Sequence, residues 1–148
     1  MTTKATALER EVRIDASPET VFGFLIEAEK MQQWMGRDVT LDPRPGGVYR
    51  CDINGNDIAG GEFVEVTPFS RVVYTFGWEG DDHPVPVGST TVEITLTPDG
   101  SGTLVRLAHR GLADPATDDH GQGWEHYLGR LAIAAAGGDP GVDANNMG

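Results

Sequence analysis

Five strand-like segments follow one another between residues 47 and 110 with no helical pattern between them, and this succession constrains the fold more than any other feature. They lie near 47–53, 60–67, 71–78, 89–97 and 103–110. Turn-forming stretches such as NGND at 54–57 and PDGSG at 98–102 separate them. Because short strands joined by short turns pair with their sequence neighbours, this region is predicted to be an antiparallel meander.

A strand and two short helices are predicted before the meander. Residues 8–15 alternate weakly between apolar and charged side chains, which indicates a first strand. Ser17 and Pro18 then suit the cap and the first position of a helix whose apolar residues recur at helical spacing. The segment EKMQQWMG at 29–36 is interpreted as a second short helix that includes Trp34.

One amphipathic helix is predicted after the meander, over residues 117–137, with Thr117 or Asp118 as its cap and Gly137 and Gly138 at its end. Its apolar residues form one stripe, with His120 one turn before them: Trp124, Tyr127, Leu128, Leu131 and Ala135. Such a helix buries its stripe most readily across the concave face of a sheet. The predicted fold is therefore α+β, a curved antiparallel six-stranded sheet wrapped around a long C-terminal helix, with two short helices between the first two strands.

The period of two within each strand predicts which side chains face that helix. The inward rows are Tyr49, Cys51 and Ile53; Val72, Tyr74, Phe76 and Trp78; Val92, Ile94 and Leu96; and Val105, Leu107 and His109. We therefore expect an interior rich in aromatic side chains. Gly60 and Gly61 interrupt one strand pattern, which indicates a bulge or bend that helps the sheet to curve.

Composition narrows the range of functions. The 148 residues fit one domain, with a core over about 8–137 and a flexible tail at 139–148. A formal net charge of −12 repels phosphate backbones and anionic headgroups, so nucleic acid is not expected as a partner. A single cysteine excludes an internal disulfide, and neither a secretory leader nor a membrane-spanning apolar run is present, so a cytoplasmic location without membrane insertion is expected.

The sequence shows no motif for a metal or a cofactor. His83, His109, His120 and His126 lack the HxH or HExxH spacing of metal sites, and no GxGxxG or GxSxG stretch follows a strand. Neither a metal nor a cofactor is therefore expected.

Several local signatures occur together along the chain. They are SPETVF after the first strand, Trp34, RPGGVYR, GEFVEVTPFSRVVYTFGW, GTLVRLAHRGL and HGQGW at the start of the last helix. Together they resemble the activator of Hsp90 ATPase homologue branch of the helix-grip superfamily, which includes SRPBCC, START-like and Bet v 1-like domains. The resemblance covers about residues 8–137.

This resemblance implies a cavity between the sheet and the last helix that holds an apolar or amphiphilic small molecule. The eukaryotic namesake stimulates a chaperone ATPase but carries an additional N-terminal domain for which this chain has no room, so a chaperone partner is not favoured. Met35 departs from the paired aromatics common at that point and implies a softer wall, since methionine adapts to irregular shapes. Homodimers are compatible with this fold, and no sequence feature decides for or against one.

Three functions are considered. The favoured one is binding of a small apolar or aromatic molecule by the expected cavity lining: Trp34, Met35, Tyr49, Cys51, Tyr74, Phe76, Trp78, Ile94, His109, His120, Trp124, Tyr127 and Leu128. The second is a cyclase-, hydratase- or lyase-like enzyme that uses His109 or Glu65 as its acid or base. His109 also fits a structural role, and Glu65 takes part only if its face of the strand is inward. The third is a protein-interaction role, such as chaperone regulation, through the acidic surface.

Overall fold

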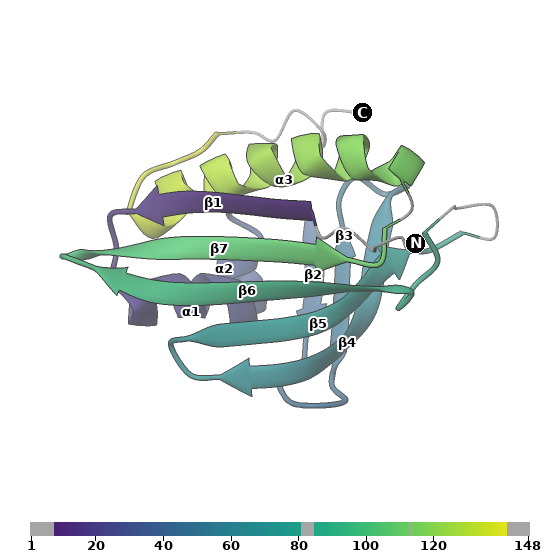
Figure 1. Cartoon of the computed structure of the whole chain (residues 1–148), viewed down its shortest axis with the longest axis horizontal. Helices are drawn as coiled ribbons and strands as arrows, with labels where there is room; N and C mark the ends of the chain where they lie inside the picture. The colour runs from purple at the N-terminus through teal and green to yellow at the C-terminus, as the bar shows by residue number, and fades with distance from the viewer. Residues whose placement is uncertain (1–7, 81–84, 113, 142–148) are drawn as a thin grey trace, which may run out of the picture.

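The computed structural model describes residues 8–80, 85–112 and 114–141 (Figure 1). Its elements follow the predicted order with one added strand: β1 (Leu8–Ile14), α1 (Pro18–Ile26), α2 (Ala28–Met31), β2 (Asp38–Leu41), β3 (Val48–Asp52), β4 (Ile58–Thr67), β5 (Arg71–Trp78), β6 (Thr90–Asp99), β7 (Gly102–Arg110) and α3 (Asp114–Ala135).

The strands form one antiparallel sheet of seven strands in the order β1-β7-β6-β5-β4-β3-β2. The sequence predicts six of them, and the strand that it misses is β2 at the edge. With four residues, of which only Val39 is fully buried, β2 is too short for an alternating pattern to stand out. The predicted α+β class and the long C-terminal helix are confirmed.

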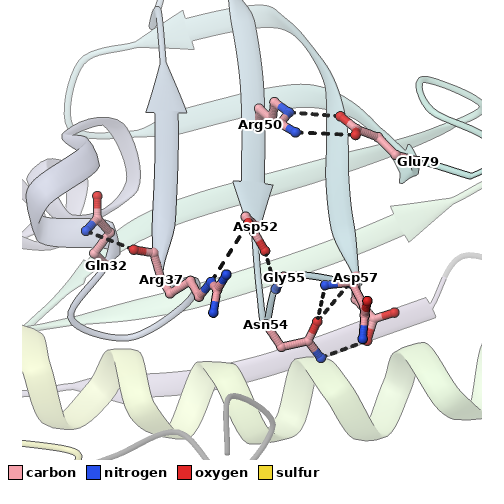
Figure 2. A network of polar contacts seen from close by, with 9 residues as sticks. Gln32, Arg37, Arg50, Asp52, Asn54, Gly55, Asp57 and Glu79 are labelled. Carbon is pink, nitrogen blue, oxygen red and sulfur yellow. Dashed lines mark hydrogen bonds and ion pairs between the residues drawn. The ribbon is translucent and has the colours of Figure 1, made fainter. Parts of the chain in front are cut away.

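Polar contacts hold β2 and the β3–β4 turn in place (Figure 2). The Arg37 guanidinium lies 3.9 Å from the Asp52 carboxylate, and the Gln32 side-chain amide donates to the Arg37 carbonyl at 3.4 Å. Within the turn, the Asn54 side chain accepts from the backbone N–H of Asp57 at 2.8 Å. Asparagine commonly closes turns in this way, so the predicted NGND turn owes its shape to its own side chains.

The first helix begins as predicted, but the second is shorter. The Ser17 hydroxyl accepts from the Thr20 backbone N–H at 3.2 Å, and Pro18 opens α1. α2 ends at Met31, so Trp34 lies in the turn that follows it. The Trp34 indole N–H donates to the Phe24 carbonyl at 2.9 Å, which folds this turn back onto α1.

The last helix begins earlier than predicted. α3 starts at Asp114, so Thr117 and Asp118 lie within it and neither caps it. Pro115 suits the first turn of a helix, where its missing N–H has no partner to lose, and it explains the earlier start. At the other end, the Gly138 N–H donates to the Ile133 carbonyl at 2.8 Å, and Gly137 takes a left-handed φ of 95°, as predicted for a helix end.

Arg130 fixes the end of α3 to two other segments. Its Nε donates to the Trp34 carbonyl at 3.0 Å, and its terminal nitrogens donate to the carbonyls of Pro140 at 3.2 Å and Gly141 at 3.0 Å. Residues 139–141 are therefore held in place, although the sequence analysis assigns them to a flexible tail. The remainder of that tail, 142–148, lies outside the described residues.

The inward rows predicted for the strands face the common core. All their side chains are buried except that of Trp78, which is half-buried. α3 packs against β1 and α1 and contributes its own buried row to the same core, with Trp124, Leu128 and Leu131 among its members. The aromatic side chains of the sheet and of α3 therefore meet.

Candidate functional site

Phe76 of β5 lies at the centre of a group of rings between the sheet and α3. Its ring centroid lies 5.0 Å from that of His109 and 5.9 Å from that of Trp124. We call the whole group the interior cluster, and its members are Tyr49, Tyr74, Phe76, Trp78, His109, His120 and Trp124. The cluster brings together predicted lining residues from β3, β5, β7 and α3.

Both ring nitrogens of His109 are engaged within the interior cluster. The Trp124 indole N–H donates to Nδ1 at 3.0 Å. Because an indole nitrogen can only donate, Nδ1 carries no proton, and the proton of the neutral ring is on Nε2. Nε2 then donates to the Thr90 hydroxyl at 2.8 Å, which donates in turn to the Phe76 carbonyl at 2.6 Å. The contacts thus fix a single tautomer of neutral His109.

Burial keeps His109 in this neutral form. It lowers the His109 pKa from 6.5 to about 3, and the nearby His120 lowers it further in the same direction. A general base needs a free lone pair and a pKa near the working pH. His109 has neither, because the lone pair on Nδ1 already accepts from Trp124. The arrangement fits the structural role considered for this residue.

A second indole–imidazole pair lies beside the first. The Trp78 indole N–H donates to His120 Nε2 at 2.9 Å, and the rings of His109 and His120 are 5.5 Å apart between centroids. The two predicted lining histidines are therefore neighbours. Since Trp78 and His109 belong to the sheet while His120 and Trp124 belong to α3, the two pairs join the helix to the sheet.

Tyr49 and Tyr74 stack face to face, although they come from β3 and β5, which β4 separates. Their ring centroids are 4.1 Å apart and their planes meet at 19°. Gly61 of β4 pairs with Tyr49 and places no side chain between the rings. A Cβ atom at Gly61 would lie 2.0 Å from the Thr75 carbonyl oxygen. This close approach of two strands agrees with the predicted bend at the glycine pair.

The Tyr49 hydroxyl is the buried side-chain polar atom that lacks a hydrogen-bond partner among the described residues. Tyr49 is only 1% exposed, and burial raises its pKa well above 10, with smaller contributions from the neighbouring Tyr74 and Cys51. Burial likewise raises the pKa of Tyr74, so both phenols are neutral. The Tyr74 side chain is near enough to raise the pKa of Tyr49, but the Tyr49 hydroxyl has no hydrogen bond to it. Most buried polar groups are paired, so the interior cluster contains unused hydrogen-bonding capacity at Tyr49.

Glu65 lies on the outer face of the sheet, so the alternative in which it serves as an interior acid or base is wrong. A β-bulge shifts the register between Phe63 and Glu65, which turns Phe63 and Val66 inward and Glu65 outward. The Glu65 carboxylate is 43% exposed and accepts from the Thr67 hydroxyl at 2.8 Å and from Arg71 Nε at 3.1 Å. These hydrogen bonds lower the pKa of the Glu65 carboxyl, and the bond from Thr67 has the largest effect.

The other predicted lining residues are buried in the same core. Trp34 and Met35 lie in the α2–β2 turn, where the Met35 carbonyl is 3.9 Å from Cys51 Sγ. The remaining members of this set are Ile94, Tyr127 and Leu128. Thr90 is a buried residue that was not predicted, although it lies two residues before Val92 and so shares the inward row of β6.

A separate hollow of about 500 Å³ opens on the outer face of β1, β7 and β6. Glu9, Glu93, Arg106 and Arg110 are among the charged residues that line it. Two of these charges are paired with each other, since Arg110 donates to Glu93 at 3.1 Å. No aromatic residue lines this hollow, so it is unrelated to the interior cluster.

The profile of the family described as Activator of Hsp90 ATPase homolog 1-like protein (AHSA1) matches residues 15–136. The chain belongs to this family. A solution structure of an AHSA1-like protein from Rhizobium etli is 44% identical, with a TM-score of 0.75, and the match covers 95% of this chain and 88% of that one. No curated protein matches the chain.

More distant structures share the AHSA1-like fold. DynU16, from the dynemicin biosynthetic locus, is 23% identical to this chain, with a TM-score of 0.78. The match covers 90% of this chain but 48% of DynU16, so the chain spans about half the length of that protein. The Aha1 dimer from Colwellia psychrerythraea is 19% identical with a TM-score of 0.77, covering 90% of this chain and 98% of that one. Within the described part of this AHSA1-like chain, no helix combines the length and apolar character needed to cross a membrane.

Proposed function

We propose that this AHSA1-like protein binds a small, uncharged and largely apolar molecule between its sheet and α3, with the Tyr49 hydroxyl as the polar anchor. The observation that carries the proposal is a buried phenol without a hydrogen-bond partner inside an aromatic interior. An unpaired buried polar group costs about 1–3 kcal/mol, so a ligand atom that pairs with it gains affinity from relieving that cost.

The remainder of the interior cluster favours an uncharged ligand. The imidazoles of His109 and His120 bind the indoles of Trp124 and Trp78, and the phenols are neutral. An ionic ligand would therefore find no charge in the cluster to compensate for its own burial, which is among the most costly events in a protein. Aromatic walls add affinity through buried apolar area, at about 25 cal/mol per Å². The ligand class is thus an apolar skeleton that carries a carbonyl or hydroxyl group.

The alternatives have less support. Glu65 lies on the outer face of the sheet and so cannot serve as an acid or base in the interior. His109 could act as a base only if its hydrogen bond from Trp124 were broken. Chaperone regulation rests on the family's description, and no feature of the described residues favours it. The association of DynU16 with a biosynthetic locus agrees with a small-molecule ligand, although its identity to this chain is low.

The test compares three probes of similar size: naphthalene, 1-acetonaphthone with its added carbonyl, and 1-naphthoate with its charge. We expect the protein to bind 1-acetonaphthone best and 1-naphthoate least. In Tyr49→Phe the preference for 1-acetonaphthone over naphthalene is expected to fall by about three- to tenfold, the value of one hydrogen bond between neutral groups. Titration by fluorescence or calorimetry measures each Kd.

Thr40→Val is the control, because it removes an exposed hydroxyl from β2 on the face of the sheet opposite the interior cluster. It is expected to leave all three affinities unchanged. Equal preference for 1-acetonaphthone in the wild type and in Tyr49→Phe would exclude Tyr49 as the anchor. Equally tight binding of 1-naphthoate would refute the uncharged ligand class. Native mass spectrometry of protein purified from its own host, with its extract analysed in parallel, would then identify any ligand held in another way.

A further inference from the structure

Phe69, in the turn between β4 and β5, adopts a backbone conformation that a bulky residue rarely takes. Its φ is +66°, and it is the only residue other than glycine with a positive φ in the described part of the chain. In this region the Cβ atom crowds the following carbonyl, which is why glycine or asparagine usually occupies it. Such strain persists only where surrounding contacts hold it, and it is concentrated at clamps and switches.

The contact that accompanies this strain is with α1. The Phe69 ring meets the Phe22 ring edge to face, with centroids 5.6 Å apart and planes at 77°. Phe22 is buried in the core, whereas Phe69 is 47% exposed. Core filling therefore does not explain why a phenylalanine occupies this turn.

The Phe22–Phe69 contact bridges two parts of the molecule that otherwise hardly meet. The α1 backbone packs against α2, α3, β6 and β7 rather than against β4 and β5. Figure 1 places the β4–β5 turn and α1 at the same end of the molecule. The ring contact therefore joins α1 to the β4–β5 turn at this end.

The proposed ligand site lies further along β5, the strand that follows the turn with Phe69. Val72 of β5 is fully buried close to the turn, and Tyr74 is the next inward residue along the strand. Tyr74 stacks on Tyr49, the proposed anchor. An opening between Phe22 and Phe69 would thus lead past Val72 to the Tyr49–Tyr74 pair.

We propose that Phe69 is a gate residue: its contact with Phe22 closes this end of the interior, and release of the strained turn opens a path to the Tyr49 hydroxyl. The function of this gate rests on the proposed ligand site, to which it would give access. The contact on one side and the strain of the turn on the other keep the closed and open states close in energy, so the gate opens without unfolding of the protein.

Cys51 supplies a test that needs no ligand. It is the only cysteine, it is fully buried, and it lies near enough to Tyr49 and Tyr74 to affect the pKa of each phenol. N-ethylmaleimide is small and uncharged, and its rate of reaction with Cys51 reports how often the interior opens. Mass spectrometry follows the labelling, and urea denaturation of each variant measures its global stability.

Phe69→Gly removes the ring while glycine accepts the same φ, so the turn keeps its shape. We expect labelling of Cys51 to accelerate about tenfold, the size of change that loss of one aromatic pair produces. Phe69→Tyr retains the ring and is expected to label at the wild-type rate. Ile133→Ala is the matched control, because Ile133 on α3 is also 47% exposed, and it is expected to change nothing.

Stopped-flow binding of 1-acetonaphthone separates the gate from the ligand site. If the gate and the ligand site are both correct, Phe69→Gly raises the association and dissociation rates together and leaves Kd within about threefold of the wild-type value. If wild-type protein binds the probe but Phe69→Gly changes neither its rates nor the labelling of Cys51, the gate is refuted while the proposed function stands. If labelling accelerates but no variant binds the probe, the gate is supported and binding of that probe class is refuted. Acceleration that follows a loss of global stability, or that Ile133→Ala shares, also refutes the gate.

Discussion

His109 should make the folded protein lose stability in mild acid, by an amount that follows from its surroundings. Its pKa is about 3 in the folded protein and about 6.5 in an unfolded chain. Between these values the unfolded state binds a proton that the folded state does not, so stability falls as the pH is lowered from 6.5 towards 3. Each pH unit in this window is worth about 1.4 kcal/mol, so His109 alone lowers the free energy of unfolding by about 2 kcal/mol at pH 5.

The variant that tests this is His109→Gln. The glutamine oxygen can accept from the Trp124 indole and its amide can donate to the Thr90 hydroxyl, yet the side chain does not titrate. Urea unfolding at pH 7, 6 and 5 gives the free energy of unfolding of each protein. We expect the variant to lose about 2 kcal/mol less than the wild type between pH 7 and pH 5.

His126→Gln is the control, since His126 of α3 lies outside the interior cluster. Parallel losses in the wild type and in His109→Gln would refute the reasoning, because they would mean that His109 takes up no proton on unfolding in this range. The same result would remove the argument for a fixed neutral tautomer.

Two further predictions concern the framework around the site. Gly61→Ala places a Cβ against the Thr75 carbonyl and is expected to destabilise the protein by about 1–3 kcal/mol in urea, whereas Gly129→Ala, with open space at its Cβ, is expected to stabilise α3 by up to about 1 kcal/mol. A neutral outcome for Gly61→Ala would show that β4 and β5 can separate there. Arg130→Met keeps the apolar stem but removes the bonds to the Trp34 carbonyl and to residues 139–141, and a loss of about 1–2 kcal/mol is expected in the same assay. Unchanged unfolding in Arg130→Met would show that water replaces these bonds at no cost.

The regular parts of the fold could be predicted because local rules govern them. Large apolar side chains recur at every second residue from Val72 to Trp78, and the pairing of β5 with β6 has no register shift, so the period of two placed Tyr74 and Phe76 correctly. The start of α1 could be predicted equally well, because Ser17 and Pro18 act on the helix that begins with them. In these segments the information lies within a few residues of where it is used.

The errors arose where distant residues decide the structure. The bulge before Glu65 reverses the face of every later residue in β4. In the sequence GEFVEV it leaves one sign, the adjacent apolar residues Phe63 and Val64, which does not show by itself which face the residues after them take. The partners of His109 likewise come from another strand and from α3, so the sequence could place the ring inside but could not show that both nitrogens are engaged. The Tyr49–Tyr74 stack depends on how closely β4 and β5 approach at Gly61, which no periodicity encodes.

All three tryptophans of the chain donate their indole N–H across a boundary between elements. Trp34 joins the α2–β2 turn to α1, Trp78 joins β5 to α3, and Trp124 joins α3 to β7. The protein therefore contains a natural fluorophore at each of three seams. In a variant with two tryptophans replaced by phenylalanine, the fluorescence of the remaining one reports on its own boundary without an added dye. Comparing the three such variants would show which boundary opens first on heating, on acidification or on ligand binding.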